Sequence, residues 1–181
     1  MRQIFLAGLL GFMLLVFASE AHAWGGVVTR VLDGDTITVK RDEDGLAIKI
    51  RLHGIDAPES TGGMWTAQPY SRQSTNLLKE LVLGKRVEIV PVDQDKYGRD
   101  VAGVVQMEDG RVAQEELIRA GLAWVYRKYT KSQYLIDMEE EARAAKRGLW
   151  AWRGGPEAPW DYRARMKKER AEKKAGVVKD E

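Results

Sequence analysis

The feature that most constrains the fold lies in residues 46–59, where a strand of alternating apolar and polar residues is followed by a charged segment. Apolar side chains occupy every second position from Ile48 to Leu52, which is the period of a half-buried strand. Gly54 then allows a close backbone approach or a bulge that redirects the chain, and Pro58 stiffens the turn that carries the carboxylates. This pattern places charges at the end of a strand, which indicates either a chemical site or an ordinary charged surface loop.

A second alternating run, residues 36–40, precedes this strand, and turn residues 41–45 separate the two. We therefore expect the two runs to pair antiparallel. The pairing brings the carboxylates of Asp33 and Asp35 near that of Asp56. Clustered carboxylates repel one another, and a divalent cation usually compensates them; oxygen ligands favour a hard ion such as calcium. Asp-Gly-Asp is also a common turn sequence, so the residues alone leave both interpretations open.

The remaining patterns predict an α+β fold that is mainly β, a small curled antiparallel barrel closed by helices. In the helix that Ser132 caps, Tyr134 is expected in the buried stripe, and Glu139 is expected on the solvated side. Further strands are predicted at 27–32, 86–92, 101–107 and 122–126, and helices at 69–83, 113–120 and 132–147.

Residues 1–23 have the pattern of a secretory signal peptide. Arg2 precedes an apolar run over residues 4–18, and Ala21-His22-Ala23 is a small-x-small cleavage sequence. A transmembrane anchor is the alternative, but the run is shorter than the roughly 20 residues that span a bilayer. We therefore expect a mature protein that starts at Trp24, is exported to the periplasm or the medium, and is not inserted in a membrane after cleavage. It contains no cysteine, so it has neither disulfides nor thiolate chemistry.

Positive charge is concentrated in a C-terminal extension, residues 153–181. The extension carries nine Lys/Arg against six Asp/Glu, whereas the whole chain has a formal net charge of +2. A predicted domain over residues 24–152 therefore lacks the broad basic surface of a protein that coats nucleic acid. The extension is expected to be a solvated helix whose Trp160 and Tyr162 pack on the domain, with a non-specific grip on nucleic acid as the alternative.

Four blocks, in order and spacing, resemble the thermonuclease or staphylococcal-nuclease-like family. They are VLDGDT at 31–36, RLHGIDAPE at 51–59, DKYGR at 95–99 and LIRAGLA at 117–123. The resemblance covers roughly residues 27–152 and implies a five-stranded OB-fold barrel with three helices. It also implies calcium-dependent phosphodiesterase activity on DNA and RNA, with single strands or frayed duplexes preferred. No obligate protein partner is indicated.

The resemblance further implies a metal site and a general base. Asp35 and Asp56 resemble the carboxylates that bind calcium, and Ala57 occupies the position whose backbone carbonyl completes the protein ligands. Glu59 resembles the residue proposed to activate the attacking water.

Phosphate-binding and pocket residues are implied in the same way. Arg51 and Arg99 resemble the two arginines that grip the phosphate, and Lys96 and Tyr97 resemble residues that line the nucleotide pocket. Asp33 resembles a carboxylate that lies behind the metal ligands. Attack on a phosphodiester builds negative charge on the phosphate oxygens, so two guanidinium groups and a cation suit this reaction.

Two other functions remain as alternatives. One is a non-catalytic OB-fold module that binds nucleic acid or protein, and the other is a small-molecule or structural calcium-binding protein. The joint presence of the expected carboxylates and both arginines favours the enzyme over either. Tyr126 and Tyr129 lie near the family's base-contacting tyrosines without aligning cleanly and carry no assignment, and His53 is expected to be a structural strand residue.

Overall fold

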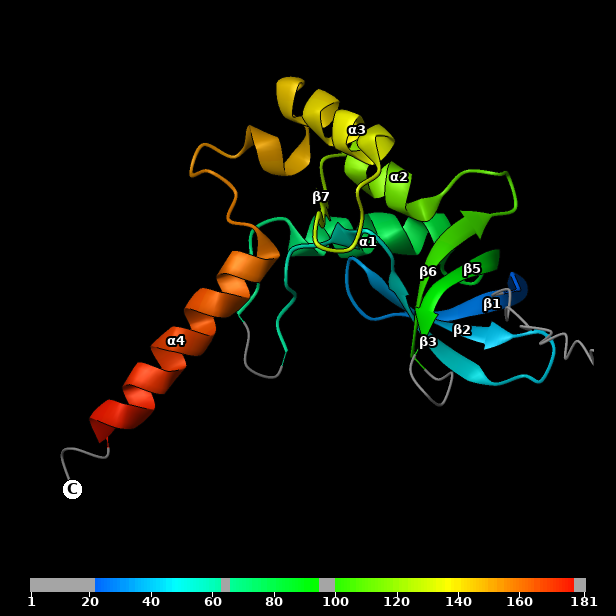
Figure 1. The fold of residues 1–181 in the computed structure, drawn as a ribbon, viewed down its shortest axis with the longest axis horizontal. Helices are drawn as coiled ribbons and strands as arrows, with labels where there is room; N and C mark the ends of the chain where they lie inside the picture. Colours follow the sequence, from blue (N-terminus) through cyan, green and yellow to red (C-terminus); the bar gives the residue numbers. More distant parts are fainter. Residues whose placement is uncertain (1–21, 63–65, 95–99, 178–181) are drawn as a thin grey trace, which may run out of the picture.

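The computed structural model describes residues 22–62, 66–94 and 100–177. Its centre is a closed barrel of five strands (Figure 1), which confirms the predicted OB-like fold. Around the barrel the strand order is β1 (Trp24–Val31), β2 (Thr36–Arg41), β3 (Ala47–Leu52), β6 (Asp100–Met107) and β5 (Arg86–Gln94), with β5 pairing back to β1.

The strand pairing departs from the expected antiparallel barrel at one seam. β2 and β3 pair antiparallel as predicted, with Thr36 opposite Arg51, whereas β3 and β6 run parallel, with Arg51 opposite Ala102. The reason is geometric: strand directions cannot alternate all the way round a closed ring with an odd number of strands. The prediction of a wholly antiparallel barrel was therefore wrong.

Three helices and a two-stranded sheet adjoin the barrel (Figure 1). The helices are α1 (Ser71–Val82), α2 (Ala113–Arg119) and α3 (Gln133–Ala144), and the small sheet pairs β4 (Ile55–Asp56) with β7 (Trp124–Val125). The main core lies inside the barrel and beneath α1 and α2, and its fully buried side chains include Ile37, Ile50, Leu78 and Leu117.

The C-terminal extension contains a further helix. After a short 3-10 turn η1 (Gly148–Ala151), helix α4 (Pro159–Val177) starts beside the domain and points away from it (Figure 1). Its first turns pack as expected: Tyr162 is buried, and the Trp160 ring stacks on that of Tyr126 at 4.9 Å. Within the described ranges, no helix is both long enough and apolar enough to cross a membrane.

Met138 and Ala142 form the buried stripe of helix α3, but two other residues lie on the opposite side from the one that the sequence predicted. Glu139, expected in solvent, is 1% exposed; its carboxylate accepts a hydrogen bond from the backbone N–H of Val125 at 2.9 Å and pairs with Arg127 and Arg143. Tyr134, expected to be buried, is 57% exposed. The buried β7 strand needs an acceptor for its N–H group, and Glu139 supplies one.

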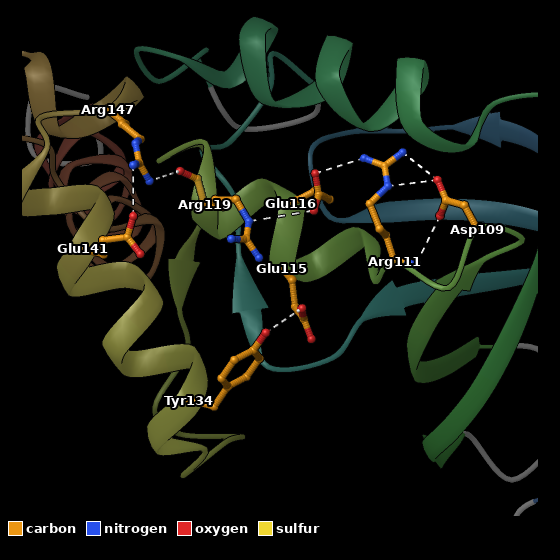
Figure 2. A network of polar contacts seen from close by, with 8 residues as sticks. All are labelled: Asp109, Arg111, Glu115, Glu116, Arg119, Tyr134, Glu141 and Arg147. Carbon is orange, nitrogen blue, oxygen red and sulfur yellow. Dashed lines mark hydrogen bonds and ion pairs between the residues drawn. The ribbon is translucent and has the colours of Figure 1, made fainter.

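Surface contacts align α3 with α2 (Figure 2). The Tyr134 hydroxyl donates to Glu115 at 3.0 Å. Arg147 donates to the backbone carbonyl of Arg119 at 3.2 Å and to Glu141 at 3.0 Å. Because these groups are exposed, each contact contributes little stability, and the two helices are joined mainly by the buried side chains of the shared core.

Candidate active site

A cavity of about 510 Å³ opens at one end of the barrel, where the segment between β1 and β2 meets the end of β3. The loop after β4 and the first turns of α4 complete its wall. The side chains that line it and carry charge or an aromatic ring are Asp33, Asp35, Arg51, His53, Glu59, Asp93, Tyr126, Tyr129 and Arg163.

Asp35 is the fixed centre of this wall. Its side chain is 7% exposed and accepts hydrogen bonds from the Thr36 hydroxyl and the Ala57 backbone N–H, each at 2.9 Å. The backbone N–H of Asp35 donates to Asp33 at 3.0 Å, and its carbonyl accepts from Leu52 at 2.8 Å. The predicted approach of the two loops is therefore present and is maintained largely by backbone groups.

Gly34 makes this approach possible. A Cβ atom at this position would lie 2.2 Å from the Ser74 hydroxyl oxygen on α1 and 2.7 Å from the Ala57 Cβ atom. Any larger residue would push the Asp33–Asp35 segment away from α1 and from the loop after β4. The Asp-Gly-Asp sequence thus serves both as a turn and as a spacer beside the cavity.

Asp56 and Glu59 share one guanidinium group. Arg163, from the second turn of α4, donates to the two carboxylate oxygens of Asp56 at 3.0 and 2.6 Å and to Glu59 at 2.6 Å. Asp56 is 2% exposed, whereas the Glu59 and Arg163 side chains are 21% and 28% exposed. A bidentate Arg–carboxylate pair of this kind is strong and directional.

Burial and crowding perturb the acidic side of the cavity. Burial and, to a smaller extent, the nearby charge of Asp35 raise the pKa of Asp33 to about 7. Burial also raises the pKa of Asp56, although the hydrogen bonds from Arg163 act in the opposite direction. The cluster therefore has an excess of negative charge that favours a positive partner.

The donor chemistry of this cluster fits a hard divalent cation. Asp35 and Asp56 offer buried carboxylate oxygens, and the hydrogen bond from Ala57 to Asp35 brings the two segments together. In the part of the chain that the structure describes, no three His, Cys, Asp or Glu side chains form a ready-made metal cluster. The two carboxylates therefore need further oxygen donors, such as a backbone carbonyl and water, and Asp56 has to share or release Arg163.

Arg51 reaches the cavity from the end of β3. Its side chain is exposed and has no ion-pair partner among the described residues, so it is available to an anionic ligand. Lys96, Tyr97 and Arg99, also predicted to belong to the site, lie outside the described residues.

Two tyrosines left without an assignment also line the cavity. The Tyr126 backbone N–H donates to the carbonyl of Gly54 at 2.8 Å, which fixes the segment after β7 against the turn after β3. Gly54 adopts a left-handed φ of 81°, which favours glycine. The rings of Tyr126 and Tyr129 meet edge to face at 5.0 Å. Both therefore belong to the site, together with the half-buried His53.

Arg163 is the site residue that sequence reasoning missed. A signal for it was present: the expected packing of Trp160 and Tyr162 holds the start of the extension on the domain. The residue next to a buried Tyr162 then also lies near the domain, and a guanidinium there can meet the carboxylates of the loop after β4.

Comparison with known proteins places the chain among proteins that are named as nucleases. The sequence model of a family described as "Staphylococcal nuclease homologue" matches residues 49–152. A relative from Escherichia coli, called an uncharacterized endonuclease, is 42% identical over 150 residues, which cover 83% of this chain and 90% of that protein. A micrococcal nuclease from Shigella flexneri is 32% identical over 165 residues, covering 84% and 90%. The chain therefore belongs to the family of staphylococcal nuclease homologues.

Proposed function

We propose that this protein is a nuclease, a calcium-dependent phosphodiesterase that hydrolyses DNA and RNA with little sequence preference. The observation that carries the proposal is that Asp35, Glu59 and Arg51 line one cavity in a chain of this family, while the buried Asp56 is joined to Glu59 through Arg163 on the cavity wall. The nuclease names of the relatives support the same reaction class.

Each residue has a role that its chemistry supports. Asp35, Asp56 and the Ala57 carbonyl would hold the calcium ion, which supplies charge neutralisation at the phosphate when bound. Glu59 takes a proton from the attacking water. The water oxygen bonds to phosphorus, the bond to the leaving oxygen breaks, and that oxygen takes a proton from solvent.

Arg51 stabilises the charge that develops on the phosphate oxygens, and Arg99 is proposed to share this role. Lys96 and Tyr97 are proposed to line the nucleotide pocket, and Asp33 to support the metal ligands from behind. The exposed ring of Tyr129 at the cavity offers a surface on which an unpaired base can stack. This supports a preference for single strands or frayed duplex ends.

The test is cleavage of single-stranded DNA by protein that starts at Trp24, with calcium and with a chelator. We expect cleavage that requires calcium and falls roughly 100- to 1,000-fold in Glu59→Gln. The matched control is Glu140→Gln, the same chemical change at an exposed position of α3, which should cleave like the wild type. Binding of DNA without cleavage, whatever divalent metal is added, would instead indicate a non-catalytic binding module.

We also propose that the protein is exported and that residues 1–23 are removed. Support comes from the first strand, because β1 begins at Trp24 and pairs there with Ile89. Removal of the preceding residues leaves every described element complete. Mass spectrometry of the protein from expressing cells should find an N-terminus at Trp24; a chain that keeps its first 23 residues contradicts export by cleavage.

A further inference from the structure

The strongest unexplained contact at the cavity joins the C-terminal extension to the acidic residues of the barrel end. Arg163 is the cavity-lining residue that α4 contributes. It lies 107 residues from Asp56 in the chain and 104 from Glu59, yet it bonds to both carboxylates at once. In the proposed function, Asp56 binds the metal and Glu59 takes the proton of the attacking water.

The position of Arg163 is built by the residues around it. Tyr162, 5% exposed, donates its hydroxyl hydrogen to the Thr66 carbonyl at 2.7 Å. The rings of Trp160 and Tyr126 are stacked, with an interplanar angle of 4°. Because these contacts directly precede Arg163 in the sequence, its guanidinium is brought to the cavity by a docked segment rather than by a free tail.

Gln68 links this docked segment directly to the loop that carries Glu59. Its amide oxygen accepts the Glu59 backbone N–H at 2.9 Å, and its amide nitrogen donates to the Glu157 carbonyl at 3.0 Å. Gln68 is itself 5% exposed. The start of the extension and the Glu59 loop are therefore parts of one hydrogen-bonded unit.

Arg163 and a cation compete for the same carboxylate. Both oxygens of Asp56 bond to Arg163, and the same oxygens would ligate a metal. A guanidinium beside the metal position also repels the cation. A cation that takes Asp56 therefore weakens the hold on Arg163 and leaves a positive charge at the wall of the cavity that Arg51 also lines.

We propose that Arg163 is a further substrate-binding arginine of the proposed active site, in addition to Arg51, and that the C-terminal extension supplies it. It neutralises Asp56 and Glu59 until a divalent cation takes Asp56, and its guanidinium then bonds to a phosphate oxygen of the nucleic acid. This inference rests on the proposed nuclease function. Arginine suits the exchange because its planar fork matches carboxylate and phosphate oxygens equally well.

Two measurements on Arg163→Gln test the proposal. Calorimetric titration with calcium alone should show tighter binding than in the wild type, on the order of threefold to thirtyfold, because the competitor is gone. At saturating calcium, the KM for a single-stranded DNA oligonucleotide should rise on the order of tenfold or more, because a charged hydrogen bond to phosphate is lost. Arg163→Lys should lie between the two proteins in both measurements.

The matched control is Arg165→Gln, an arginine on the same helix whose ion pairs are with Glu157 and Glu169 and not with the cavity. It should keep the calcium affinity and the KM of the wild type. Circular dichroism checks that every variant is folded, and Arg163→Lys carries the test if the glutamine variant is not.

The proposal is overturned if either calcium affinity or KM stays at the wild-type value in a folded Arg163→Gln protein, or if calcium binds more weakly there. A wild type that does not cleave DNA with any divalent metal removes the proposed function instead. In that case the calcium titration still decides whether Arg163 and the cation compete, so the two failures are distinguishable.

Discussion

The two halves of the proposed active site are held by different kinds of contact. On the barrel side, Asp35 is fixed by backbone groups of Ala57 and Leu52, which belong to the sheet and its loops. On the extension side, Arg163 is fixed by its own side-chain bonds and by neighbouring rings. Sheet contacts can be lost only with the fold, whereas side-chain pairs can change partners within it. The barrel half is therefore preorganised, whereas in the extension half Arg163 can exchange one bonding partner for another.

Removal of the extension after Trp152 should have the largest effect on stability. It exposes the surface that Tyr162 and Trp160 cover, and we expect the free energy of unfolding to fall by about 2–3 kcal/mol. Urea denaturation measures this change. The barrel should still unfold in one cooperative transition; loss of that transition would show that the extension is part of the barrel's folding unit and would end the distinction between the halves.

A shorter truncation, after Met166, keeps Arg163 and tests the second interpretation of the extension, a non-specific grip on nucleic acid by the rest of α4. DNA binding measured over a series of salt concentrations should keep its salt dependence if the basic part of α4 makes no phosphate contacts. A clearly shallower dependence would support the grip.

Asp35→Ala should be the next largest change. It removes the acceptor of the buried Ala57 N–H, and an unsatisfied buried donor is expected to reduce stability by about 2 kcal/mol. Urea denaturation measures this as well. Asp137→Ala, an exposed aspartate on α3, is the control and should stay within about 0.5 kcal/mol of the wild type. An equally stable Asp35→Ala protein would contradict the preorganised barrel half.

Trp160→Ala should have a smaller effect on stability, about 1 kcal/mol, because it removes one stacked ring pair. It sharpens the comparison because it loosens Arg163 without altering the guanidinium. Thermal unfolding and calcium titration on the same sample should show a modest loss of stability together with tighter calcium binding. Unchanged calcium binding would mean that Arg163 keeps its position without the stack.

Glu157→Gln should have the smallest effect on stability, and this effect should be present at neutral pH and absent in acid. The hydrogen bonds from Arg165 hold the pKa of Glu157 below its usual value, so its stabilising contribution is complete above the unfolded pKa and is lost as pH falls through the lower folded value. The pair is exposed and screened by solvent. Thermal midpoints of wild type and variant should differ slightly at pH 7 and converge in acid, once the pH is below the lowered pKa of Glu157; a difference that grows in acid would reverse this assignment.

The carboxylate cluster was predictable because it follows from a local hairpin. Once residues 36–40 pair with the strand before Gly54, Asp35 must lie near Asp56. Arg163 was not predictable in the same way, because no local periodicity encodes a contact across 107 residues. Glu139 was misjudged because a charged helix residue is usually solvated, and only the tertiary contact with β7 reveals its buried acceptor role.

Closure of the barrel has a consequence for the order in which the molecule can form during synthesis. β1 is synthesised first, yet one of its two neighbours is β5, so the pairing of Trp24 with Ile89 cannot form until β5 has been synthesised. The pairing of β3 with β6, in which Ile50 lies opposite Val101, is delayed in the same way. Pairings over such separations form slowly. While β4 and α1 are being synthesised, the three strands β1–β3 form a sheet with two unpaired edges. A chaperone or another chain that binds these edges would therefore do so before the cavity has formed.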